Sequence, residues 1–465
     1  MTTSTTEPTA PLPTQVLEAL IAIVGREHVL TDPEITASYS HDWSGRYAGS
    51  IFGVVRPAST DEVSSIVKVC AAHRIPVLPQ GGNTGLVGGS VPGPTDPSML
   101  IVSTRRLNRL DPVDERVGQV TVGAGVTLGE LHAHANAAGW NYGVDLASRE
   151  SCTVGGNIGT NAGGIRVCCY GMTRKQVVGI EVVLPDGSIM SHLSGLMKDN
   201  TGYNFPSLFT GSEGTLGVVT AARLALVRPP RASAVALIGV RDAQHALDIV
   251  NSAVPAGSRL LAAEILDAPL LRLIADTASL PMPLPSPSPH VLLLETESAA
   301  PGDIAMDLPD DVEAVIATDQ STKARFWRYR ELAGETVGRL GITHRFDVSV
   351  PRHRWDEFSQ AVRVAVMELP DVHHYFSFGH LADGNLHLEV IGPAADDERA
   401  DETVLNLVAD FGGSISAEHG VGRQKAKYLH LSRSASELAA MRAIKTAFDP
   451  YGLFNPGALL LVEAN

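Results

Sequence analysis

The chain has 465 residues, a formal net charge of −15 at pH 7 and 44% hydrophobic residues. This hydrophobic content is ordinary for a folded globular protein, and the length suggests about three structural units. The negative charge disfavours nucleic acid or an anionic membrane as a partner, because both require a basic surface.

The first fourteen residues, MTTSTTEPTAPLPT, are rich in Thr and Pro and lack the basic and apolar segments of a signal peptide. We expect them to form a disordered lead, and no apolar run reaches the roughly 18 residues of a membrane span. The four cysteines form no C-x-x-C pair and no iron–sulfur spacing. We therefore expect reduced thiols in a cytoplasmic protein.

The elements expected in chain order begin with a helix over residues 15–25, where apolar residues have helical spacing. Strand, helix and strand then alternate to about residue 80, and a second strand-rich segment with the hairpin signal LPDGS follows. The sequence Arg228-Pro229-Pro230-Arg231 marks a domain boundary. Beyond it, strands and helices alternate again, and two helices are expected near 398–411 and 434–448. This pattern predicts helices packed on sheets.

Two glycine-rich segments stand out. PQGGNTGLVGGSVPG (79–93) directly follows a strand, so its backbone N–H groups can turn toward one concavity that suits a phosphate. It is either a pyrophosphate cradle or a glycine turn without a ligand, and it lacks the G-K-[ST] of a Walker A loop. ESCTVGGNIGTNAGG (150–164) either admits a flat heterocycle or packs a tight loop. GAGVTLG (123–129) misses the G-x-G-x-x-G fingerprint by one residue, so we reject a Rossmann site.

The stretch GHLADGNLHLEV (379–390) reads as a hairpin that turns at Asp383-Gly384. In the expected register His380 lies directly opposite His387, with Cβ atoms about 4.5–5.5 Å apart. Two imidazoles at that spacing can share a metal ion. The alternative is a polar outer face that happens to carry histidines.

These motifs occur together with KDNTGY (198–203), GSEGTLGVVT (211–220), SAEHGVGR (416–423) and NPG (455–457). As a set they cover most of residues 40–460 and resemble the vanillyl-alcohol oxidase superfamily. Within it the chain is most similar to the FAD-linked D-2-hydroxyacid dehydrogenases, above all the D-2-hydroxyglutarate dehydrogenases. D-lactate dehydrogenases and the FAD subunit of glycolate oxidase are near relatives.

The resemblance implies an α+β fold. After the disordered lead (1–14) it places a vanillyl-alcohol-oxidase-type FAD-binding domain of two α/β subdomains at 15–228. An α/β cap domain that binds substrate and metal would span 229–425. A C-terminal helical segment, 426–465, would return to the FAD domain.

The resemblance also implies where FAD binds: the pyrophosphate on the first glycine segment, and the flavin and ribityl chain on the second. The implied residues are Pro79, Gly81, Gly82, Asn83, Thr84, Gly85, Leu86, Gly89, Ser90, Gly155, Gly156, Asn157, Thr160, Asn161, Gly164, Glu213, Thr215, Gly217, Val219 and Asn455. Relatives that bind flavin covalently often use a histidine in the first loop. Because this loop has Asn83 and no histidine, we expect non-covalent FAD.

The resemblance assigns a metal to His380, His387 and Glu418. Two histidines and one carboxylate with open positions suit catalytic Zn²⁺, and Mn²⁺ or Fe²⁺ is chemically possible. The metal would lower the pKa of a substrate hydroxyl, and His419 would be the general base or, alternatively, an orienting residue. The expected reaction is metal-assisted oxidation of a D-2-hydroxyacid to the 2-oxoacid, with hydride transfer from C2 to flavin N5. Asn385 either hydrogen-bonds the substrate or serves the turn.

The resemblance makes Arg330, in an Arg-Glu pair, the residue that grips the substrate carboxylate. Arg345 stands where hydroxyglutarate dehydrogenases carry a lysine, and Gly334 where they carry a threonine of the substrate site. The arginine preserves the charge, so D-2-hydroxyglutarate stays the first candidate substrate. The glycine removes a hydroxyl and enlarges the pocket, so D-lactate, another D-2-hydroxyacid or a glycolate-type oxidase reaction are the alternatives. Without cluster cysteines, electrons must pass to a separate acceptor, an electron-transfer flavoprotein or a quinone. The oligomeric state stays open, a homodimer included.

Overall fold

The computed structural model describes residues 11–43, 45–297 and 306–461, so most of the expected disordered lead lies outside the described residues. It divides into two compact units, which are described separately. Unit 1 comprises Met1–Ala162, Met172–Arg228 and His419–Asn465, and unit 2 comprises Gly163–Gly171 and Pro229–Glu418. The division at 228/229 falls where the prolines stand. The other limits differ from the expected ones, because unit 2 ends at Glu418 rather than at 425 and includes the short segment 163–171.

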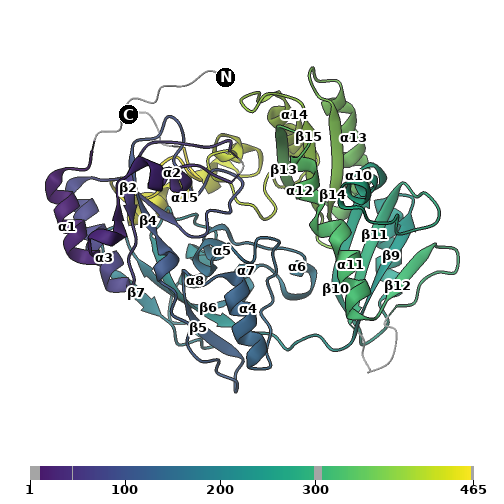
Figure 1. Cartoon of the computed structure of the whole chain (residues 1–465), viewed down its shortest axis with the longest axis horizontal. Coiled ribbons are helices and arrows are strands. Elements are labelled where there is room, and N and C mark those ends of the chain that lie inside the picture. Colours follow the sequence, from purple (N-terminus) through teal and green to yellow (C-terminus); the bar gives the residue numbers. More distant parts are fainter. Residues whose placement is uncertain (1–10, 44, 298–305, 462–465) are drawn as a thin grey trace. The chain divides into compact units, whose positions relative to one another are not determined.

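Unit 1 begins with a small sheet and its helices (Figure 1). The elements are α1 (Thr14–Val24), η1 (Arg26–His28), β1 (Val29–Leu30), α2 (Pro33–Ser40), β2 (Ile51–Val55), α3 (Thr60–His73), β3 (Val77–Gln80), β4 (Met99–Ser103) and η2 (Thr104–Arg106). The sheet order is β1-β2-β4-β3, with β2, β4 and β3 parallel. Parallel neighbours need crossover connections, and the apolar faces of α1 and α3 pack with these strands in one core.

A second sheet of unit 1 is antiparallel. Its elements are β5 (Gln119–Gly123), α4 (Leu128–Ala137), α5 (Val154–Thr160), α7 (Thr173–Gln176), β6 (Val177–Val183), β7 (Ile189–His192), α8 (Phe205–Phe209) and β8 (Val218–Ala225). The order is β5-β8-β6-β7, and the LPDGS turn joins β6 to β7 as predicted. Helices α4 and α5 pack on this sheet through a core of their own.

The end of the chain belongs to unit 1 and packs on its two sheets. It contains η4 (Ala426–Leu431) and α15 (Ala435–Phe448), close to the predicted 434–448. Phe448 stacks edge-on against Phe209 at 5.7 Å between ring centroids. Phe454 is buried in the core of the first sheet and bridges to Val77 of β3.

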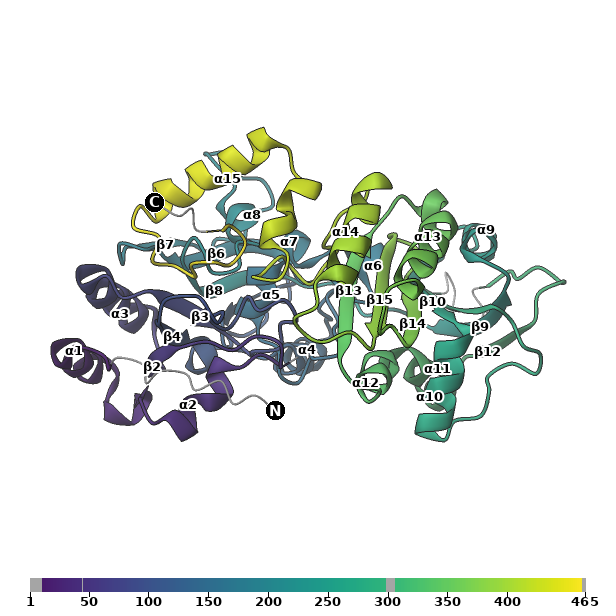
Figure 2. The same ribbon diagram turned by 90° about the horizontal axis from the view of Figure 1, so that it is seen from above.

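Unit 2 is built on one large antiparallel sheet (Figure 2). Its elements are α6 (Val167–Tyr170), β9 (Ser233–Val240), α9 (Ala243–Ala253), β10 (Arg259–Asp267), α10 (Ala268–Ala278), β11 (His290–Glu297), β12 (Ala314–Ala317), α11 (Gln320–Glu331), α12 (Ala333–Gly338), β13 (Thr343–Ser349), η3 (Arg352–Arg354), α13 (Trp355–Met367), β14 (His374–His380), β15 (Asn385–Ile391) and α14 (Arg399–Asp410). The seven strands have the order β12-β9-β11-β10-β14-β15-β13. Helices α10, α11 and α12 cover one face of the sheet, and α9, α13 and α14 lie on the other.

Among the residues that the structure describes, no helix combines the length and the apolar character that crossing a membrane requires.

Candidate functional site

The predicted histidine hairpin is present as β14 and β15, but its predicted register was wrong by two residues. His380 pairs with Asn385, and His387 pairs with Phe378 rather than with His380. The turn consists of residues 381–384. Gly384 closes it with a φ of +82° and donates its N–H to the His380 carbonyl at 3.2 Å, so that the return strand begins at Asn385. Because side chains alternate along a strand, a shift of two residues keeps both histidines on one face. They are diagonal neighbours, with ring centroids 5.3 Å apart.

Three potential ligand atoms converge on this face of unit 2. The His380 Nε2 atom lies 3.1 Å from Glu418 Oε1 and 3.4 Å from His387 Nε2, and His387 Nε2 lies 3.7 Å from Glu418 Oε1. Tetrahedral bonds of about 2.0–2.1 Å place two ligand atoms about 3.3–3.4 Å apart. The triangle therefore has the size and the donor chemistry of a small divalent metal site.

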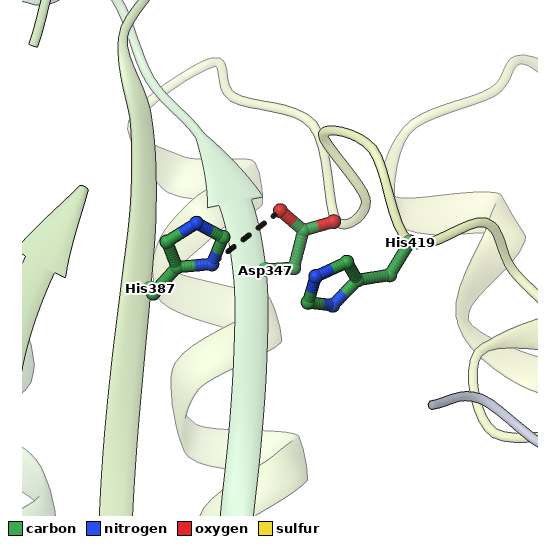
Figure 3. A group of neighbouring side chains, drawn as sticks. All are labelled: Asp347, His387 and His419. Carbon is green, nitrogen blue, oxygen red and sulfur yellow. Dashed lines mark ion pairs between the residues drawn. The ribbon is translucent and has the colours of Figure 1, made fainter. Parts of the chain in front are cut away.

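Two buried carboxylates that sequence reasoning missed hold the ligands in place. Glu264 of β10 accepts from His380 Nδ1 at 2.7 Å, which leaves Nε2 directed at the cluster. Asp347 of β13 forms an ion pair with His387 at 3.9 Å (Figure 3). It also accepts from the Glu418 N–H at 2.8 Å. The only sequence signal for Glu264 and Asp347 was an acidic residue inside an apolar strand. Such a carboxylate needs a hydrogen-bond or ion-pair partner when it is buried.

The buried carboxylates of Glu264 and Glu418 favour a positive charge in the cluster. Burial lowers the pKa of the His380 imidazolium, but Glu264 and Glu418 together raise it to about 10. Although burial raises the pKa of Glu418, His380 brings it down to about 2. The second oxygen of Glu418 accepts a bond from the N–H of Gly164. A divalent cation would satisfy the same carboxylates that otherwise hold a proton on His380.

Arg330 of α11 lies beside the cluster. Its Nε donates to Glu264 at 2.6 Å, and its Nη2 is 3.5 Å from His380 Nε2. The guanidinium also stacks 4.8 Å from the Phe378 ring centroid. One carboxylate thus positions both a histidine that was predicted to bind a metal and the arginine that was predicted to bind the substrate carboxylate.

Arg345 lies on the same face of the sheet, two residues before Asp347 on β13. Its Nη2 donates to the Gly334 carbonyl at 3.2 Å, and its Nε lies 3.4 Å from Oε2 of Glu389, its cross-strand partner. Sequence reasoning missed Glu389, which is 4% exposed. Burial raises the pKa of Glu389 to about 7, against the pull of the Arg345 charge.

Asn385 and His419 were also predicted as site residues. The Asn385 amide donates to Asp347 Oδ1 at 2.8 Å and to the Val348 carbonyl at 3.1 Å, so it joins the hairpin to β13. These contacts favour a role in the turn over a role in substrate binding. His419, also drawn in Figure 3, follows Glu418 directly in the chain and is counted with unit 1.

In unit 1 the two glycine segments pack against each other. A Cβ atom on Gly81 would stand 2.3 Å from Thr153 Oγ1, and one on Gly82 would stand 2.1 Å from the Ser151 carbonyl. Around Gly159, by contrast, a Cβ would meet nothing within 4 Å. Asn157 Nδ2 and Ser103 Oγ are buried without a hydrogen-bond partner among the described residues. Open space and unsatisfied polar atoms fit a large polar ligand such as FAD.

Other side chains predicted to contact FAD are engaged in holding the loops. Asn83 donates to the His41 carbonyl at 2.9 Å and accepts from Ser90, and Asn161 caps α5. The Glu213 carboxylate accepts from the N–H groups of Val421 and Gly422, both at 2.7 Å. The remaining predicted residues lie as follows: Pro79 lies within β3; Thr84, Gly85, Leu86 and Gly89 lie in the first segment; Gly155, Gly156 and Thr160 lie in α5; Thr215 Oγ1 donates to the Ser212 carbonyl; Gly217 directly precedes β8 and Val219 lies in it; and Asn455 donates to the carbonyls of Gly89 and Glu213.

Comparison with known families identifies two domains. Residues 52–192 match the FAD binding domain, and residues 229–459 match the C-terminal domain of FAD linked oxidases. The chain is 36% identical over 452 residues to the D-2-hydroxyglutarate dehydrogenase of Xanthomonas citri pv. viticola, covering 92% of this chain and 93% of that protein. It is 35% identical over 440 residues to the mitochondrial D-2-hydroxyglutarate dehydrogenase of Danio rerio, covering 92% and 82%.

Solved structures confirm the predicted fold class. p-Cresol methylhydroxylase aligns with a TM-score of 0.73 at 16% identity, covering 97% of both chains. Alkyldihydroxyacetonephosphate synthase aligns with a TM-score of 0.71 at 16% identity, covering 97% of this chain and 86% of that one. The resemblance read from the motifs is confirmed, and the chain belongs to the FAD-linked D-2-hydroxyacid dehydrogenase family that includes the D-2-hydroxyglutarate dehydrogenases.

Proposed function

We propose that this protein oxidises a D-2-hydroxyacid to the 2-oxoacid with non-covalent FAD, assisted by a divalent cation at His380, His387 and Glu418. The observation that carries the proposal is the ligand triangle of 3.1, 3.4 and 3.7 Å with Arg330 beside it. D-2-hydroxyglutarate is the first candidate substrate, because the curated relatives are named for it.

The residues of unit 2 bind and orient the reacting end of the substrate. The Arg330 guanidinium is a planar fork that can take a carboxylate in two parallel hydrogen bonds. Glu264 holds that fork and the His380 ring together, so the carboxylate and the neighbouring hydroxyl are presented in one orientation. A bound Zn²⁺, Mn²⁺ or Fe²⁺ would act as a Lewis acid that lowers the pKa of the hydroxyl.

The proton and the electrons leave by separate routes. We assign the hydroxyl proton to an imidazole nitrogen of His419, which the chain ties directly to the ligand Glu418. FAD held by the two glycine segments would supply the two-electron acceptor, at flavin N5, for the hydride from C2. The four cysteines lack cluster spacing, so the electrons pass on to a separate acceptor such as an electron-transfer flavoprotein or a quinone.

Anaerobic reduction of the flavin tests this function directly. We expect D-2-hydroxyacids, D-2-hydroxyglutarate among them, to bleach the flavin absorbance, and we expect a chelator to slow the bleaching. An equal response to L-isomers, or bleaching that the chelator leaves unchanged, would contradict the proposal. Rapid reoxidation of the reduced flavin by air would instead indicate a glycolate-type oxidase. Release of the yellow cofactor on acid precipitation tests the non-covalent attachment.

A further inference from the structure

Glu389 carries a buried oxygen, Oε2, that lies in an ion pair but accepts no hydrogen bond from the described residues. The residue is 4% exposed. The same oxygen has Arg345 Nε as its ion-pair partner at 3.4 Å. Buried carboxylate oxygens are usually hydrogen-bonded as well, so the missing hydrogen bond on this face of the sheet points to a donor on a ligand.

Glu389 lies where the tail of a small substrate would reach if the carboxylate of that substrate were held at the cluster. On β15 it follows the ligand His387 by two residues, so both side chains lie on one face, about 6.5–7 Å apart along the strand. Two rows cross three strands there. Asp347, His387 and Phe378 form one row, and Arg345, Glu389 and Phe376 form the next. A four- or five-carbon acid held by its carboxylate at the first row extends its tail to the second.

There is room for such a tail beside Arg345. The Arg345 guanidinium donates to the carbonyl of Gly334 at 3.2 Å. A Cβ atom built on Gly334 would meet nothing within 4 Å. The residue whose carbonyl contacts Arg345 therefore has open space at its own Cβ position.

The charges of the second row decide which tail fits. Arg345 and Glu389 balance each other, so a second substrate carboxylate would bring an unmatched negative charge toward Glu389. An ionised carboxylate only accepts hydrogen bonds, and a guanidinium only donates them. A terminal amide or hydroxyl can serve both at once, donating to Glu389 and accepting from Arg345.

We propose that Glu389 is a specificity-determining residue that favours 2-hydroxyacids with an uncharged polar tail over those that end in a second carboxylate. The inference rests on the proposed function and names the substrate class of the same site. Arg345 alone would favour a dicarboxylate, and Glu389 opposes that preference.

A pair of substrates of nearly equal shape tests the proposal. D-2-hydroxyglutarate and the amide of its distal carboxyl differ only at the tail, and kcat/KM is measured for both at pH 8 with the FAD-loaded protein. We expect the wild type to use the amide at least as well as the acid. Glu389→Gln should shift the ratio toward D-2-hydroxyglutarate by about 10-fold or more, chiefly through KM. The exposed Glu357→Gln carries the same charge change and should leave the ratio unaltered.

Other outcomes overturn the proposal or identify a different failure. A wild type that strongly prefers the dicarboxylate, or a Glu389→Gln change that scales both substrates equally, would overturn it. If Glu389→Gln does not retain FAD, Glu389→Asp is tested instead, because it keeps the charge but moves it away on a shorter side chain. A change in the ratio of the two kcat/KM values then supports the proposal. If neither acid reduces the flavin, the proposed function fails. The tail preference is then read from flavin difference spectra with 2-oxoglutarate and its distal amide.

Discussion

The Oε1 atom of Glu264 lies 2.7 Å from Nδ1 of His380, and this contact orients the imidazole so that Nε2 meets Glu418 and His387. The other oxygen of Glu264 holds Arg330 at 2.6 Å. A carboxylate that is 1% exposed therefore couples the histidine proposed to bind the metal to the arginine proposed to bind the substrate carboxylate.

Removing a ligand should abolish turnover and spare the flavin. We expect His387→Ala to lower kcat/KM by more than about 100-fold, because two remaining ligands hold a cation weakly. FAD absorbance should persist, since the glycine segments, apart from Gly163 and Gly164, belong to unit 1 and His387 belongs to unit 2. The control is His374→Ala, an exposed histidine on β14. Unchanged activity in His387→Ala would contradict the metal site.

Neutralising Glu264 should weaken metal binding without removing a ligand. Glu264→Gln keeps a hydrogen-bonding oxygen but loses the charge that faces His380 and Arg330. Loss of such an orienting partner costs about 10–100-fold in metal affinity. Metal content after titration with a chelator measures the effect, and added Zn²⁺ should restore part of the activity. A purely structural role would lower thermal stability and leave the chelator midpoint where it is.

Metal binding should stabilise unit 2. A ligand present at about 100 times its Kd stabilises the folded state by about 2.7 kcal/mol. Calorimetric unfolding of the same protein with Zn²⁺ and after chelation should therefore differ in Tm by several degrees. His387→Ala should show a much smaller difference. Equal Tm values for the wild type under both conditions would mean that the cluster does not hold the metal.

The Glu213 carboxylate should anchor the C-terminal part of unit 1. Glu213→Ala would leave the N–H groups of Val421 and Gly422 buried without an acceptor, at about 1–3 kcal/mol for each. We expect a lower Tm and faster proteolysis near residue 421. Glu213→Gln retains one acceptor oxygen and should lose less. Equal stability of all three proteins would show that water replaces the carboxylate.

Much of the site was predictable from the sequence because its signals are local. The Asp-Gly turn and the period of two along a strand place His380 and His387 on one face in either register. The two glycine segments likewise predicted a large polar ligand, since their chemistry belongs to short stretches of backbone. The expected helices near 15–25, 398–411 and 434–448 appear within two residues of those limits, because apolar periodicity specifies a helix directly.

The register and the supporting carboxylates depended on tertiary structure. Where β15 begins is decided by Gly384 and by the bonds of Asn385 to β13, which no pattern within the hairpin reveals. Glu264 meets His380 only because β10 pairs with β14 across more than a hundred residues of chain. A buried charge shows in the sequence that it needs a partner, but only the pairing of distant strands decides which partner it has. For Glu389 that pairing supplied Arg345 as an ion-pair partner of Oε2 but no hydrogen bond to it.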